Sequence, residues 1–164
     1  MDAIVVYESL WGNTADVARA VAMGLGAGAR ALRVDEVRAE DVAGACLSVA
    51  GAPVFGFKLS SHKMRDGIRR DPGRGFAPDL SCPLLRDWLE DLPRGDKPVA
   101  AFDTRVRGPF GKGSPEILRL FEERGYVAVA EPEGFVVKGS QGPLRKGELE
   151  RARAWGAQLA LTQP

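Results

Sequence analysis

The sequence predicts an α/β fold, a three-layer structure in which a doubly wound sheet of five parallel strands is covered by helices on both faces. Two observations support this prediction. Five short apolar runs alternate with segments of helical periodicity, as expected for parallel strands connected by crossover helices. The hydrophobic fraction of 45% in 164 residues is enough for one core but hardly for two. Residues 1–164 are therefore predicted to form a single domain.

Three of the five strands are expected in the first third of the chain. Residues 3–7 form an uninterrupted apolar run that leads into a helix, whose apolar positions recur at helical spacing up to a cluster of glycines around Gly26. Residues 29–34 and 46–52 are predicted as the second and third strands, with a helical turn at 40–43 between them.

Residues 57–81 break this alternation. The segment is rich in Gly, Pro, Lys and Arg, and its few apolar residues show little periodicity. We interpret it as a long excursion of the same domain, and we expect it to form a mobile cover at the carboxyl edge of the sheet.

Regular patterns return in the second half of the chain. Residues 84–92 have helical periodicity, residues 98–103 are predicted as the fourth strand, and a glycine-rich loop follows at 104–113. Ser114 is predicted to cap the next helix, because a serine hydroxyl satisfies free N–H groups and Pro115 is tolerated in the first turn. Residues 126–137 supply the fifth strand, and a last helix begins near Lys146.

Composition excludes several classes of protein. Charged residues nearly cancel, with a formal net charge of +1, which gives no indication of a nucleic-acid or membrane partner. Cys46 and Cys82 lie far apart and form no metal-binding pair, so we predict neither a metal site nor a disulfide framework. No run reaches membrane-spanning length, and the amino terminus has no basic flank typical of a signal peptide. We expect a soluble, cytoplasmic protein.

The first strand is followed by a loop suited to binding an anion. The loop comes directly before a helix, whose free N–H groups and partial positive charge attract a phosphate, and it contains hydroxyls at both ends and a glycine. The alternative is that the polar residues only cap the helix. The residues predicted to bind the anion are Ser9, Leu10, Trp11, Gly12, Asn13 and Thr14.

This segment resembles the signature of flavodoxins. The shared features are the apolar Val5 and Val6, the aromatic Tyr7, the hydroxyls of Ser9 and Thr14, and the small Gly12. The resemblance implies a flavodoxin-like sheet with strand order 2-1-3-4-5 and FMN as cofactor, with its phosphate on this loop. It also implies that the loops after the third and fourth strands hold the isoalloxazine ring, and the candidates there are Pro53, Val54, Phe55, Gly56, Asp103, Thr104, Arg105, Gly108 and Phe110, with Phe57 as a further candidate for ring contact.

Two functions remain open at this point. The first is an FMN-binding redox protein that passes electrons to a protein partner or a small acceptor, either as a carrier or as a small reductase, with no side chain acting as catalytic acid or base. The second is a flavodoxin-like domain without flavin that binds anions or another protein. Val54 and Phe55 favour the second, because related proteins often carry Thr-His there. The intact phosphate loop favours the first.

Local charge adds an expectation about the partner. Two of the loops expected at the cofactor are basic, so we predict that they stabilise the fully reduced, anionic flavin and attract an anionic partner. The alternative is an ordinary solvated surface. The residues concerned are Lys58, Lys63, Arg65, Arg69, Arg70 and Arg74 in the excursion, and Arg105, Arg107 and Lys112 in the later loop.

Overall fold

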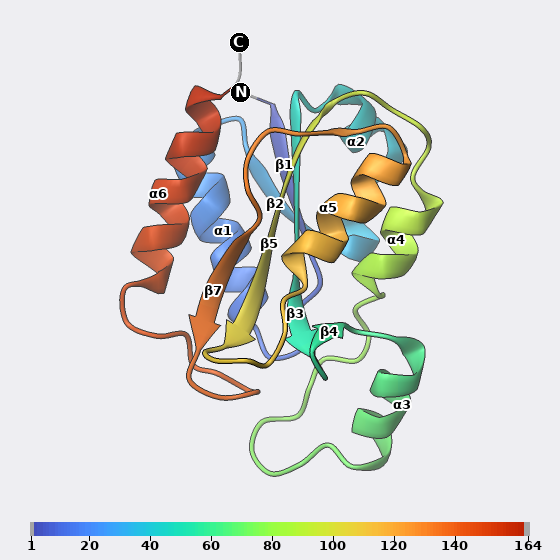
Figure 1. The fold of residues 1–164 in the computed structure, drawn as a ribbon, viewed down its shortest axis with the longest axis vertical. Helices are drawn as coiled ribbons and strands as arrows, with labels where there is room; N and C mark the ends of the chain where they lie inside the picture. The colour runs from blue at the N-terminus through green and yellow to red at the C-terminus, as the bar shows by residue number, and fades with distance from the viewer. Residues whose placement is uncertain (1, 163–164) are drawn as a thin grey trace.

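A computed structural model describes residues 2–162, and its main element is a sheet in which β3 pairs in parallel with both β1 and β5. The strand path is β2-β1-β3-β5-β6, with β7 also parallel to β5 (Figure 1). Because β5 is the fourth predicted strand and β6 with β7 the fifth, the predicted order 2-1-3-4-5 is confirmed. The parallel strands are β1 (Ala3–Tyr7), β2 (Arg30–Arg33), β3 (Leu47–Phe55), β5 (Pro98–Val106), β6 (Val127–Ala128) and β7 (Glu133–Val137).

Helices cover both faces of the sheet and complete the three predicted layers. Side chains that alternate along β1 point to opposite faces, so Val5 lies in one apolar core and Ile4 in the other. Figure 1 shows α1 and α6 together on one side, and α2, α4 and α5 on the other. The helices are α1 (Asn13–Leu25), α2 (Ala39–Gly44), α4 (Leu85–Asp91), α5 (Ser114–Glu123) and α6 (Glu148–Leu161), and a short 3-10 helix, η1 (Val34–Glu36), follows β2.

Close packing joins α1 to α6. A Cβ atom added at Gly24 would lie 2.0 Å from the carbonyl oxygen of Arg153, and one added at Gly156 would lie 2.2 Å from that of Val21. Only glycine allows the two helix backbones to approach this closely. The glycine cluster at the end of α1 therefore serves packing and helix termination, with Gly26 at the C-cap.

Several predicted boundaries differ from the structure. The third and fourth strands extend further than predicted, so β3 includes Pro53 to Phe55 and β5 includes Thr104 to Val106. The predicted fifth strand is interrupted between β6 and β7 near Pro132, because a proline has no N–H to donate to a sheet ladder.

The segment 57–81 contains regular structure that the sequence analysis missed. The strand β4 (Lys58–Leu59) returns antiparallel to β3, and the helix α3 (His62–Arg70) follows it. Figure 1 shows α3 beyond the carboxyl end of β3, apart from both helical layers. Its partly buried apolar side chains are Met64 and Ile68, too few to create a visible periodicity. Whether the segment is mobile stays a prediction.

The amino end of α5 is capped differently from the prediction. Gly113, not Ser114, is the N-cap residue, and the cap comes from Asp103 on β5. The Asp103 Oδ2 atom accepts hydrogen bonds from the N–H groups of Gly113 (2.9 Å) and Ser114 (2.8 Å) and from the Ser114 hydroxyl (2.8 Å). A carboxylate is a stronger acceptor than a hydroxyl and interacts favourably with the positive end of the helix dipole.

A buried ion pair connects three elements. Glu8, directly after β1, is 1% exposed, and its Oε1 atom lies 2.6 Å from Nη2 of Arg65 on α3. Its other oxygen accepts the N–H of Leu85 at the start of α4, at 2.9 Å. Arg65 also donates to the carbonyl oxygen of Cys82. The pair therefore holds α3 and the start of α4 against the end of β1.

No helix among the described residues is long and apolar enough to cross a bilayer.

We expect Arg65→Met to lower the free energy of unfolding by about 3–5 kcal/mol, because it leaves the Glu8 carboxylate buried without a counter-charge. The double variant Glu8→Gln/Arg65→Met should recover much of this loss. Arg69→Met is the matched control, since Arg69 pairs with Asp66 on the surface of the same helix and should contribute less than about 1 kcal/mol. Urea unfolding measures all three. Equal effects of the two arginine substitutions would contradict the assignment.

Candidate functional site

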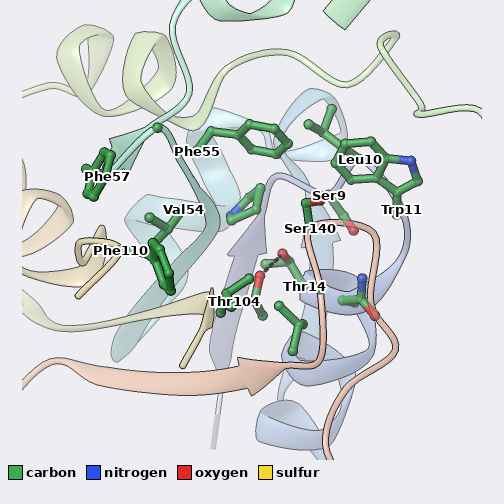
Figure 2. Close-up of a pocket in the computed structure, with 16 residues that line it drawn as sticks. Ser9, Leu10, Trp11, Thr14, Val54, Phe55, Phe57, Thr104, Phe110 and Ser140 are labelled. Carbon is green, nitrogen blue, oxygen red and sulfur yellow. Dashed lines mark hydrogen bonds between the residues drawn. The ribbon is translucent and has the colours of Figure 1, made fainter. Parts of the chain in front are cut away.

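A cavity of about 380 Å³ opens at the carboxyl edge of β1, β3 and β5 (Figure 2). The three predicted loops meet there, as expected at the switch point of a doubly wound sheet. The predicted residues that line it are Ser9, Leu10, Trp11, Asn13, Thr14, Pro53, Val54, Phe55, Gly56, Thr104 and Phe110. Phe57, the further candidate for ring contact, also lines it, and the lining residues that were not predicted are Val106, Val137, Gly139 and Ser140.

The loop Ser9–Thr14 forms one end of the cavity. Gly12 is the N-cap residue of α1 with a φ of 91°, a left-handed conformation that favours glycine. Its N–H donates to the Ser9 hydroxyl oxygen at 3.1 Å, which leaves the Ser9 hydroxyl hydrogen available to a ligand. The loop therefore presents a hydroxyl beside the positive end of a 13-residue helix.

A pair of buried hydroxyls lies at the centre of the site. Thr14 Oγ1 from α1 and Thr104 Oγ1 from β5 are 2.8 Å apart, and Figure 2 shows both near Ser9 and Ser140. One threonine donates to the other, and the acceptor keeps its own hydrogen for a further acceptor. Four hydroxyls from three segments of the chain thus lie at one end of the cavity, those of Ser9 and Thr14 from one loop, Thr104 from β5 and Ser140 from the loop after β7.

The loop after β7 was not selected by the sequence analysis. Asn13 Nδ2 donates to the carbonyl oxygen of Gln141 at 3.1 Å, and a Cβ added at Gly142 would lie 2.4 Å from Asn13 Oδ1. This close contact places Gly139 and Ser140 against the cavity. Gly139 and Ser140 follow the last predicted strand, which ends at the same edge of the sheet as the other parallel strands. This position in the sequence could have indicated that they lie at the cavity.

Aromatic side chains form the walls of the cavity. Trp11 and Phe55 are stacked with ring centroids 5.5 Å apart and an interplanar angle of 23°. Phe57 and Phe110 form a second pair at 6.4 Å, and Figure 2 shows the two pairs on different sides of the opening. The Trp11 indole N–H donates to the carbonyl oxygen of Phe76 at 2.9 Å, which fixes its ring. These walls suit a flat aromatic ligand.

A tight turn presents Phe57 to the opening. Gly56 and Phe57 have positive φ values of 51° and 74°, as a two-residue turn between β3 and β4 requires. This conformation costs a residue with a side chain on the order of 1 kcal/mol. A bridge to Gly111 stabilises it, and the approach is so close that a Cβ added at Gly111 would lie 2.1 Å from the Phe57 oxygen.

The segment between α3 and α4 is attached to the loop Ser9–Thr14. The Asp79 N–H donates to the carbonyl oxygen of Leu10 at 2.7 Å, and Asp79 Oδ2 lies 2.9 Å from Arg33 Nη1. Hydrogen bonds from Ser81 and the charge of Arg33 hold the pKa of Asp79 below its usual range. Burial raises the pKa of the Cys82 thiol.

Four predicted residues do not line the cavity. Gly12 is the N-cap residue of α1 in the loop Ser9–Thr14, and Gly108, with a φ of 121°, packs beside Phe110. Asp103 is fully buried and caps α5. Arg105 Nη2 donates to Asp103 Oδ2 at 2.7 Å. Two of the cations predicted to add positive charge near the cofactor are thus paired with carboxylates, Arg105 with Asp103 and Arg65 with Glu8.

None of the sixteen lining residues carries a charge. The groups that this lining offers to an anion are therefore the helix end and the hydroxyls, not a cationic side chain. Among residues 2–162 there is no group of three or more His, Cys, Asp or Glu side chains that could hold a metal ion.

No protein-family model and no curated protein matches this chain. Solved structures do. A flavodoxin from the domain Archaea has a TM-score of 0.69 at 19% identity, over 98% of this chain and 97% of that one. Oxidised flavodoxin 1 from Bacillus cereus has a TM-score of 0.64 at 17% identity, over 97% of both chains.

A flavodiiron core protein from Synechocystis sp. PCC6803 has a TM-score of 0.62 at 16% identity, and the match covers 97% of this chain but 35% of that one. The chain thus matches whole flavodoxins and one part of a larger protein. At these identities the likeness concerns the three-dimensional arrangement, which agrees with the strand order and the helical layers described above. The chain therefore has the flavodoxin-like fold.

Proposed function

We propose that this chain is an FMN-binding redox protein that transfers electrons to a protein partner or a small acceptor. The observation that carries the proposal is one cavity with anion-binding groups at one end and aromatic walls at the other. When bound, FMN supplies the electron chemistry, and the protein supplies position and electrostatics. The likeness to flavodoxins supports the same proposal.

The polar end of the cavity suits the FMN phosphate. The Ser9 and Thr14 hydroxyls lie at the start of α1, where free N–H groups and the helix dipole favour an anion. Thr104 orients the Thr14 hydroxyl through their mutual hydrogen bond. The uncharged lining is compatible with a phosphate because a helix end alone attracts negative charge.

The apolar end suits the isoalloxazine ring. Trp11, Phe55, Phe57 and Phe110 offer aromatic faces to a flat ring. Val54 and Phe55, which replace the polar pair of related proteins, line this end and provide apolar contact in place of hydrogen bonds. The proposed role of these side chains is to orient the ring and to exclude water from one part of it.

A reducing, cytoplasmic location is part of the proposal. Cys46 and Cys82 are not joined in a disulfide.

One measurement separates this function from a flavin-free anion-binding module. The purified protein is incubated with excess FMN and desalted, and its visible absorption spectrum is recorded. Retained flavin absorbance at one FMN per chain supports the proposal. A colourless protein that still binds inorganic phosphate would support the alternative.

We expect Thr14→Ala to weaken FMN binding by about 1.5–3 kcal/mol, or roughly 10- to 150-fold in Kd, because it removes a hydrogen bond to a charged group. Thr14→Ser keeps the hydroxyl and should bind almost as the natural chain does. Thr162→Ala, at the end of α6, is the remote control. Flavin fluorescence titration measures Kd, and circular dichroism checks the fold. Unchanged affinity in Thr14→Ala would refute the phosphate assignment.

The charge at the opening leads to a prediction for the bound flavin. Arg107 is exposed and has no carboxylate within 4.0 Å among the described residues, so its charge favours the fully reduced, anionic flavin. We expect Arg107→Gln to lower the potential for the last electron by roughly 20 mV, equivalent to about 0.5 kcal/mol. Arg94→Gln, at the opposite edge of the sheet, should have no effect. A redox titration at low salt gives both values, and identical shifts would show that Arg107 does not act locally.

A further inference from the structure

The charge of the chain is unevenly distributed in space. Residues 57–76, 104–113 and 138–147 contain 12 of the 23 Lys and Arg residues but 2 of the 22 Asp and Glu residues. These three segments therefore carry a formal net charge of +10, and the rest of the chain carries −9. All three lie at the carboxyl edge of the sheet, the lower end of the molecule in Figure 1, and each contributes lining residues to the cavity.

Several of these cations are exposed and unpaired. Arg65 and Arg105 are neutralised by Glu8 and Asp103 and do not contribute to the charge of this surface. Five other cations, all of them exposed, lie next to residues that line the cavity or hold its loops. Among residues 2–162, none of these five has a carboxylate within 4.0 Å. We call them the basic rim, and they are Lys58, Arg74, Arg107, Lys112 and Lys138.

Contacts place the rim residues around the opening. Lys58 follows Phe57, and Lys112 follows Gly111, the residue that bridges to Phe57. Arg74 belongs to a segment joined to the loop after β7, because its carbonyl oxygen accepts a hydrogen bond from Gln141 at 2.9 Å. The rim thus extends from the Phe57 side of the cavity to the loop that begins at Lys138.

Exposed aromatic side chains accompany the rim. The exposed fractions are 63% for Phe57, 49% for Phe110 and 86% for Phe76. Phe57 and Phe110 line the opening, and the backbone of Phe76 is joined to the cavity wall, because its carbonyl oxygen accepts the hydrogen bond of the Trp11 indole. Exposed aromatic groups inside a charged rim are typical of protein interfaces.

We propose that the basic rim and these phenylalanines form a docking surface for an acidic redox protein, which would exchange electrons at the cavity opening. This inference rests on the proposed redox function. A partner with carboxylates around its own redox centre complements the rim in charge. The cations surround an opening rather than following a track along one element, as nucleic-acid binding would favour. Two of the phenylalanines line a concave mouth and pack on each other, whereas membrane insertion favours a protruding apolar face.

The test measures binding of an acidic [2Fe–2S] ferredoxin as probe by isothermal titration, with and without FMN. Binding is expected in both cases, and Kd should rise at least about ten-fold when ionic strength increases from about 0.01 M to about 0.15 M, since the Debye length falls from about 30 Å to about 8 Å. Lys58→Gln/Arg107→Gln should weaken low-salt binding about ten-fold. The matched control is Arg94→Gln/Arg153→Gln, which removes two exposed cations elsewhere that have no carboxylate within 4.0 Å in the described part of the chain, and it should change Kd less than two-fold.

The outcomes are distinct. Equal losses in the two double variants would mean that net charge alone acts, and absence of ferredoxin binding would overturn the docking surface. Tighter, rim-dependent binding to single-stranded DNA or to vesicles of anionic lipid would replace the protein partner with one of those. Failure to retain FMN would reject the proposed function. The Kd for ferredoxin would still be measured in that case, because the titration is also carried out without flavin.

Discussion

The parallel pairing of β3 with β1 and β5 is the constraint that determines where the candidate site lies. Tyr7 is opposite Gly51, and Pro53 is opposite Thr104, so all three strands end at the same edge. The chain leaves the carboxyl end of each strand at this edge before it enters the next helix. The loops that follow the strands therefore meet there. The amino end of α1 and the aromatic loop after β3 are thus brought together by backbone hydrogen bonding alone, although they are far apart in the sequence.

Strand pairing brings the loops together, but side chains fix their shape. Glu8 and Arg65 hold the excursion against the end of β1, and Asp103 fixes the start of α5 after a glycine-rich loop. The bridge between Phe57 and Gly111 joins the two loops proposed to flank the ring. These contacts are buried or involve backbone at close range, and each supports a loop that has little core of its own.

The sequence analysis succeeded where structure depends on local pattern. The run at Ala3–Tyr7, the helix after it and the loop between them follow from apolar periodicity and helix-capping chemistry over a few residues. The predictions failed where the partner of a charged side chain is not part of a local pattern, whether that partner is near or distant in sequence. The role of Asp103 depends on Ser114, and the burial of Arg65 depends on Glu8, 57 positions away. Helix α3 was missed because its apolar side is short, and the charge of Arg105 was misjudged because its neighbour Asp103 points back towards it.

The resulting site separates two kinds of electrostatics. Inside the cavity no lining residue is charged, so an anion there depends on short-range hydrogen bonds and on the end of α1, which surrounding salt screens weakly once solvent is displaced. Outside the cavity the unpaired cations act over the range of the Debye length and are screened by salt. In the proposed function, the hydroxyls that would hold the anion and the cations that would attract a partner are therefore different residues, although Phe57 and Phe110 belong to both the cavity wall and the docking surface.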